Sequence, residues 1–295
     1  MASCRNTGTA YCGRARNLSP ATRGKGIKAM PDFIFDMDLN QLAITITVLV
    51  VASVFVGLVL VKPILRLLMG TGPDFNEHLS YVTGGFSLFY GLLLGLLTVA
   101  AYQNSERIRD GIQNEAASLG VLYTSLDSYP EPLRSDVRAM MRDYVLYTIN
   151  ADWPAHRQGD MLNGGTDRIA AMRNKLARFE PKTTGQEIVH TDVLGGFQRF
   201  NEARQVRLSG TITGIPGVLW YAVLVGAAVN ILLIIMLKMR PVQQFVLGSI
   251  TAFFLGVILF VIIVLDRPLR GPAGLPPAPF ELLWQKTMVW DEAAI

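Results

Sequence analysis

Residues 79–102 read LSYVTGGFSLFYGLLLGLLTVAAY, a stretch without a charged residue. As a helix rising about 1.5 Å per residue it would be about 36 Å long, which exceeds the roughly 30 Å hydrocarbon core of a bilayer. We therefore predict a membrane-spanning helix that tilts in the lipid or projects beyond it.

Three further apolar runs with few or no charges lie at residues 39–61, 215–237 and 241–265. The chain of 295 residues is 51% hydrophobic and only 17% charged, with a mean hydropathy of +0.33, which is more apolar than an ordinary soluble domain. The last two runs are separated only by a very short charged turn, so they must form an antiparallel hairpin. The sequence predicts an all-α membrane protein with four transmembrane helices.

Residues 103–214 lie between the second and third runs and have a normal polar composition. Apolar residues recur there at spacings of three and four, which predicts a helical domain. Since no helix breaker lies between Tyr102 and Gln103, we expect the second crossing to continue beyond the lipid as one rod that ends near Pro130. Fourteen Arg and Lys balance fourteen Asp and Glu in this domain, so no nucleic-acid partner is expected.

These patterns divide the chain into five parts. They are a disordered basic tail (1–38), transmembrane helices 1 and 2 (39–102), a helical domain (103–214), transmembrane helices 3 and 4 (215–265) and a Pro-rich C-terminal tail (266–295). Four crossings place both tails and the domain on one side of the membrane. Near the membrane that side has Arg23, Lys25, Lys28, Arg107, Arg109, Arg199, Arg204, Arg207, Arg267 and Arg270, whereas the other has Lys62, Arg66, Lys238 and Arg240. The excess predicts that the domain and both termini are cytoplasmic.

Sequence motifs give little support for catalysis or for a cofactor. The histidines His78, His156 and His190 match no metal-ligand spacing, and Cys4 and Cys12 lie in the N-terminal tail. No nucleophile elbow, phosphate loop or dinucleotide fingerprint is present. A membrane enzyme would need a buried polar cluster that the sequence does not display, so we expect no catalytic residues, no metal and no cofactor.

The second crossing has a polar stripe and a glycine stripe side by side. Thr83, Ser87, Tyr90 and Thr98 form the first, and Gly84, Gly91 and Gly95 form the second. In one interpretation the hydroxyls bond to carbonyls of their own helix and the glycines pack neighbouring helices. In the other, several copies of this helix surround an axis. Candidate pore-lining residues are then Thr83, Phe86, Ser87, Phe89, Tyr90 and Leu93, with the Phe and Leu side chains forming an apolar constriction.

Other polar residues near the membrane have structural interpretations. Asn230, deep in the third crossing, is predicted to make an interhelical hydrogen bond. Asp266 is expected to pair with Arg267 or another arginine at the domain junction. Glu106, Asp110 and Glu115 are expected on a solvated face with interleaved arginines, the alternative being a vestibule wall.

Several short motifs resemble a bacterial family of bestrophin-like membrane proteins. The longest is the run from Phe89 to Leu97, which leads into residues 101–104. The shorter motifs are Glu115-Ala116, Leu122-Tyr123, Tyr129-Pro130-Glu131-Pro132-Leu133-Arg134, Asp143-Tyr144-Val145, Trp153-Pro154 and Leu265-Asp266-Arg267-Pro268. The likeness covers about residues 39–283.

The resemblance implies a bestrophin-like architecture and an oligomeric ion channel, with a pentamer favoured and a tetramer possible. In bestrophins the second helix lines an apolar neck, for which Phe86, Phe89 and Leu93 are the counterparts by position. Membrane lipid and inorganic ions are the expected partners, and a bacterial inner membrane the expected location. An acidic calcium-binding run is not evident, and both anion- and cation-conducting relatives exist. The alternative is a non-conducting membrane scaffold or sensor, in which the rod transmits a signal and the glycines pack a dimer.

Overall fold

The computed structural model describes residues 37–68 and 75–289, and within them every regular element is a helix. Four helices of the described part are long and apolar enough to cross a membrane. The predicted disordered tail, apart from its last two residues, lies outside the described residues.

The membrane part begins with α1 (Leu39–Val56), a π-helical turn (Gly57–Val61) and α2 (Lys62–Leu68). The apolar run predicted as the first crossing ends at residue 61, but the helix continues through Lys62 and Pro63 to Leu68. The wider hydrogen-bond ring of the π turn accommodates a residue that has no amide hydrogen. The proline therefore does not end the helix.

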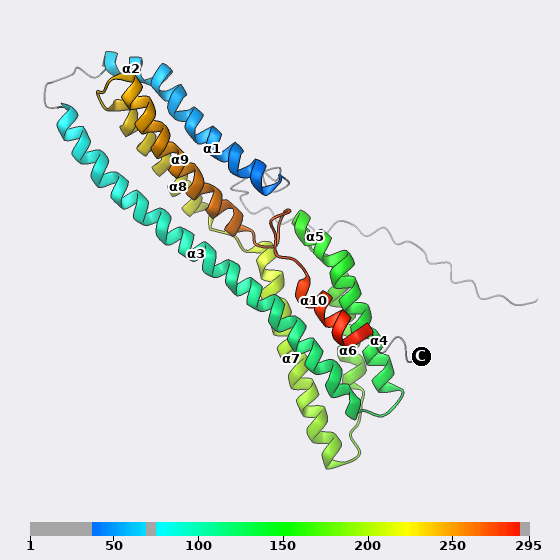
Figure 1. The fold of residues 1–295 in the computed structure, drawn as a ribbon. Helices are drawn as coiled ribbons and strands as arrows, with labels where there is room; N and C mark the ends of the chain where they lie inside the picture. The colour runs from blue at the N-terminus through cyan, green and yellow to red at the C-terminus, as the bar shows by residue number, and fades with distance from the viewer. Residues whose placement is uncertain (1–36, 69–74, 290–295) are drawn as a thin grey trace, which may run out of the picture.

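The second crossing is the first half of α3 (Phe75–Ser125), which is continuous over 51 residues and is followed by a 3₁₀ turn (Leu126–Ser128). A helix of that length extends about 76 Å, so it spans the membrane and continues to the far end of the molecule (Figure 1). The predicted rod is confirmed.

The other two crossings are α8 (Gly217–Met236) and α9 (Pro241–Asp266). They lie between α1 on one side and α3 on the other (Figure 1). Close approach of α1 and α9 depends on glycine, because a Cβ at Gly256 would lie 2.9 Å from the Cα of Thr47.

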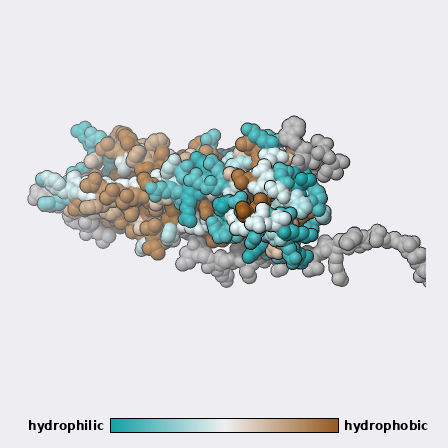
Figure 2. Space-filling view, turned by 90° about the horizontal axis from the view of Figure 1, so that it is seen from below, coloured by the Kyte–Doolittle hydropathy of each residue, from teal (hydrophilic) through white to brown (hydrophobic). Residues whose placement is uncertain are grey.

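Outside the membrane, α3 packs along α7 (Thr184–Ile212), and shorter helices cover the pair. These are α4 (Leu133–Tyr147), a π-helical turn (Thr148–Asp152), α5 (Trp153–Gln158) and α6 (Gly164–Ala177). Their shared core includes Leu119, Met141, Leu176 and Phe200, all of which are fully buried. Figure 2 shows the resulting contrast between an apolar membrane half and a mostly polar domain.

The Pro-rich segment after Asp266 packs onto this domain. It forms α10 (Ala278–Leu283) and a π-helical turn (Trp284–Met288), and Phe280 and Met288 are fully buried in the domain core. The indole nitrogen of Trp153 donates a hydrogen bond of 2.9 Å to the carbonyl of Leu275. Up to residue 289, the predicted tail is therefore part of the helical domain.

Substitution of Gly256 by alanine is expected to destabilise the membrane part by about 1–3 kcal/mol, the usual cost of overpacking. The added methyl group would meet the backbone of α1, which cannot rotate away. Gly85→Ala is the matched control, because nothing among the described residues lies within 4 Å of its Cβ position. Thermal unfolding of the two purified variants in detergent measures the difference, and equal melting temperatures would contradict the close α1–α9 contact.

Candidate functional site

Tyr90 anchors the packed face of α3. It is 5% exposed, and its hydroxyl donates a 2.9 Å hydrogen bond to the carbonyl of Val223 on α8. Its ring stacks against Phe86 with the centroids 6.0 Å apart, and Gly226 leaves the space for it because a side chain there would collide with the Tyr90 ring. Tyr90 thus belongs to the contact between α3 and α8.

The other hydroxyls of the polar stripe are satisfied within the chain. Ser87 donates to the side-chain oxygen of Asn230 over 3.2 Å, which is the interhelical role predicted for Asn230. Thr83 and Thr98 donate to the carbonyls of Leu79 and Leu94 on their own helix. A hydroxyl group that has no water to bond to needs an acceptor in the protein. Tyr90 and Ser87 find their acceptors on α8, so this part of the stripe faces α8.

These contacts place Tyr90 and Ser87 on the side of α3 that packs against α8. Tyr90 is buried against α8, while Thr83, Phe86 and Ser87 are half-buried on the same packed side, so they do not form one open stripe. Leu93 is also half-buried, beside the membrane core. Of the predicted pore-lining residues only Phe89 lies on the open side, with 73% of its surface exposed.

The open side of α3 has two columns of residues. Gly84, Gly91 and Gly95, at spacings of seven and four, form the glycine column, and within the described chain no atom lies within 4 Å of their Cβ positions. Phe89, Leu92 and Leu96, at spacings of three and four, form the apolar column, and all three are exposed. The glycines predicted to pack helices thus find no partner helix within the described chain.

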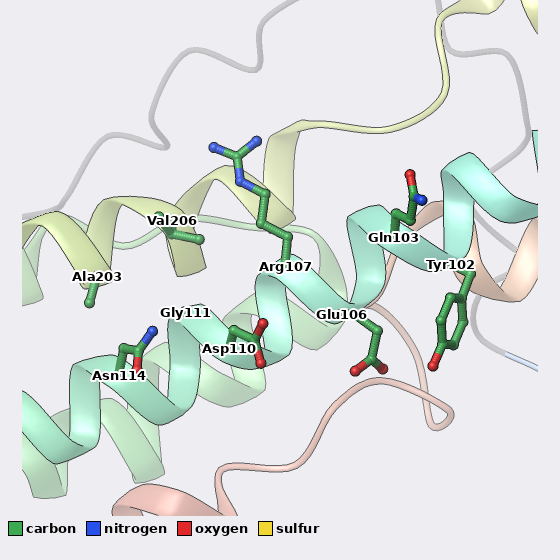
Figure 3. A pocket seen from close by; sticks show the side chains of 9 residues that line it. All are labelled: Tyr102, Gln103, Glu106, Arg107, Asp110, Gly111, Asn114, Ala203 and Val206. Carbon is green, nitrogen blue, oxygen red and sulfur yellow. The ribbon is translucent and has the colours of Figure 1, made fainter.

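The apolar column becomes polar where α3 leaves the membrane. Gln103, Glu106, Asp110 and Asn114 continue it at helical spacing and border an open depression of about 410 Å³ against α7 (Figure 3). The depression is lined by Tyr102, Gln103, Glu106, Arg107, Asp110, Gly111, Asn114, Ala203 and Val206. Glu106 pairs with Arg109 at 2.9 Å. One face of a single helix thus passes from apolar to polar.

Glu115 does not share that solvated face, contrary to the prediction. It is fully buried and accepts two hydrogen bonds from Arg207 of α7, at 2.7 and 3.1 Å, and one of 2.5 Å from Tyr144 of α4. Burial raises the pKa of the Tyr144 hydroxyl, and the adjacent Glu115 charge raises it further. Burial lowers the pKa of Arg207, but the charges of Glu115, Tyr144 and Asp152 and the hydrogen bonding to Glu115 together outweigh it, so this pKa is raised. The pair joins the helix of the second crossing to the helix that leads into the third.

More polar groups surround this pair. Arg207 contacts Nδ1 of His156 at 3.3 Å, and burial, followed by the charges of Arg207 and Arg204, lowers the pKa of His156 to about 3. Arg204, 2% exposed, donates to Thr166 over 3.1 Å. Asp152 is also buried nearby. The sequence analysis missed this cluster, although Glu115, Arg204 and Arg207 interrupt apolar stripes at helical spacing, a signal that could have revealed it.

Asp266 fixes the junction between domain and membrane. Its carboxylate accepts a 2.5 Å hydrogen bond from the amide of Ile215, just before α8. The predicted ion pair with Arg267 is present at 3.9 Å, and Arg267 also donates a hydrogen bond of 3.4 Å to the carbonyl of Thr211. The end of α9 is thus tied to the segment that connects α7 to α8.

Among the described residues no group of three or more potential metal ligands comes together. The buried carboxylates of Asp152 and Glu115 interact electrostatically. Arg204 and Arg207 also interact with Asp152. Such a neighbourhood opposes a divalent cation.

Comparisons with known proteins agree with this fold. No curated protein matches the sequence. A bacterial bestrophin homolog from Klebsiella pneumoniae, solved as a point mutant, is similar with a TM-score of 0.60 and 11% identity, covering 86% of this chain and 99% of that one. Two crystal structures of membrane-protein point mutants have TM-scores of 0.63 and 0.62, at 11% and 12% identity, covering 86% and 85% of this chain and 99% and 98% of theirs.

The sequence itself gives the family. The bestrophin-like domain matches residues 48–280, which include most of the first crossing, all of the other three and most of the helical domain. The chain therefore belongs to the bestrophin-like family of membrane proteins.

Proposed function

We propose that the protein is an oligomeric ion channel in which copies of α3 surround the conducting axis. The observation that supports it best is the open side of α3, where a glycine column lies beside an apolar column. Glycine gives no packing advantage on a helix face that contacts only lipid, whereas small residues allow two transmembrane helices to approach closely. The glycine column would then contact the neighbouring copy.

The apolar column is the proposed pore lining. Phe89, Leu92 and Leu96 would form the constriction, since rings of apolar side chains control ion passage by excluding water. Gln103, Asp110 and Asn114 would line a wetter vestibule where the same face leaves the membrane. Bestrophin-family membership supports this assignment, and the Klebsiella structure is named as a bestrophin homolog. A pentamer is the favoured copy number, with a tetramer as the alternative.

The proposed location is a bacterial inner membrane, with the domain and both termini in the cytoplasm. Arg204 and Arg207 are buried and no longer count toward the flanking positive charge. The domain side keeps Arg23, Lys25, Lys28, Arg107, Arg109, Arg199, Arg267 and Arg270, against Lys62, Arg66, Lys238 and Arg240 on the other side. The bias keeps its direction without the two buried residues.

Conduction is tested with planar bilayers that contain verified, folded oligomer. Phe89→Ala is expected to raise single-channel conductance severalfold, because it widens the apolar ring. Ile44→Ala on α1 is the control, since Ile44 is 64% exposed and α1 lies across α8 and α9 from α3 (Figure 1). Absence of current from the wild-type oligomer would favour a non-conducting scaffold, in which the long α3 rod only transmits a signal.

A further inference from the structure

Asp152 is a buried acid without a hydrogen-bonding partner. It ends the π-helical turn between α4 and α5 and is 1% exposed. Neither carboxylate oxygen has a donor within hydrogen-bond distance among the described residues. An ionised carboxylate in such a place loses its hydration and gains no hydrogen bond in return. The neutral acid is therefore much better accommodated.

Charged and titratable groups face Asp152 from every helix around it. Those that interact with it electrostatically are Glu115 on α3, Tyr147 on α4, Arg168 on α6, and Arg204 and Arg207 on α7. Tyr144, His156 and Asp167 interact with members of this group. Arg207 is held by Glu115, so Arg204 is the cation available to an ionised Asp152. Its Nε has no acceptor among the described residues.

Gly165, in the first turn of α6, separates these two groups. A Cβ built on it would lie 2.9 Å from Oδ2 of Asp152 and 3.1 Å from Nη2 of Arg204. Arg204 meanwhile uses Nη2 to hold Thr166, the next residue of α6. If Asp152 is charged, its attraction for Arg204 competes with the contact that fixes the start of α6 on α7.

We propose that Asp152 is a proton-binding site whose charge controls how tightly the π-helical turn and the start of α6 pack against α7. With the proton bound, Arg204 stays on Thr166 and the segment is closed. Without it, the segment opens to hydrate the carboxylate or to pair it with Arg204. The inference does not require that the protein conduct ions.

The sign of the pH dependence follows from two opposing groups. Burial raises the pKa of the Asp152 carboxyl above its ordinary 3.8, although Arg207 and Arg204 oppose this. The neutral Asp152 carboxyl therefore stabilises the folded state fully below pH 3.8. This stabilisation is lost as the pH rises through the folded-state pKa of Asp152. The pKa of His156 is lowered from 6.5 to about 3, so its contribution is present above 6.5 and is lost as pH falls toward 3. Folded His156 therefore stays neutral over the range in which Asp152 loses its proton.

The test is hydrogen–deuterium exchange of residues 148–166 in the full chain in nanodiscs, corrected for the intrinsic pH dependence of exchange. From about pH 4 to about pH 8 the opening equilibrium of the wild-type segment, taken relative to that of Asp152→Asn at the same pH, is expected to rise severalfold. Exposed Asp152 loses its proton at lower pH than buried Asp152, while the opposing change from His156 is common to both proteins. Emission of Trp153, which follows Asp152 directly and is 2% exposed, should change over the same range.

Asp152→Asn, a neutral isostere, is expected to lack the rise in opening with pH and to keep only the opposing change from His156, whose exposure is favoured as pH falls below 6.5. Asp143→Asn is the matched control, because Asp143 is an exposed acid on α4 that pairs with Arg168 at the surface. It should retain the wild-type titration. The proposal is overturned if wild type and Asp152→Asn have the same pH dependence, or if that neutral variant fails to fold.

Discussion

Arg207→Met is expected to destabilise the protein by about 3–5 kcal/mol, the largest effect of any single substitution proposed for the helical domain. Methionine fills much of the same space but leaves the Glu115 carboxylate fully buried without its cation. Tyr144 alone would then satisfy a charge that now accepts three hydrogen bonds. The measurement is thermal unfolding of the detergent-purified protein, followed by circular dichroism.

Arg109→Met provides the control, because Arg109 pairs with Glu106 at the surface with half of its side chain exposed. Loss of such a pair changes stability by less than about 1 kcal/mol. Replacing both partners, as Glu115→Leu with Arg207→Met, should recover part of the loss, since no buried charge remains. If Arg207→Met melted together with Arg109→Met, the buried pair would not be a structural joint between α3 and α7.

Gly91→Leu is expected to convert the oligomer into monomers without unfolding them. Within the described chain nothing lies within 4 Å of its Cβ position, so a leucine fits the isolated protomer. Between copies, the same side chain would prevent the close helix contact that the glycine column allows. Mass photometry of solubilised particles measures the copy number, and circular dichroism establishes that the helices remain.

Leu88→Ile serves as the matched control, because Leu88 is 71% exposed on the same helix and the change conserves volume. It should leave the copy number unchanged. Gly91→Leu particles of wild-type size would mean that the glycine column faces lipid, and the proposed arrangement of α3 around an axis would have to be abandoned.

Some features follow from the sequence because they depend on local composition. Four long runs with few or no charges are typical of membrane-spanning helices. The uninterrupted helical spacing across Tyr102 and Gln103 predicts that the second helix continues beyond the membrane. Pro63 shows the limit of such local rules, since a π-helical turn allowed the helix to continue past it. Likewise, the residues after Asp266 were predicted only as a Pro-rich tail, yet Phe280 is buried in the domain core.

The rotation of α3 illustrates why other features could not be predicted. In lipid both the packed and the open sides of a helix are apolar, so hydrophobic periodicity does not say which side faces protein. Hydrogen bonds decided it: Tyr90 reaches a carbonyl of α8, and Ser87 reaches Asn230. Neither partner could be identified from the second crossing alone.

The sequence by itself therefore determined the membrane class, the number of crossings and the rod, because burial of apolar runs in lipid depends on composition and length. Tertiary structure decided which residues of α3 are packed and which are open. It also brought Glu115, Arg207 and Asp152 together, although 92 residues separate the first two along the chain. A charge on an apolar stripe is stable only with a partner from another helix, and that partner is set by how the helices cross.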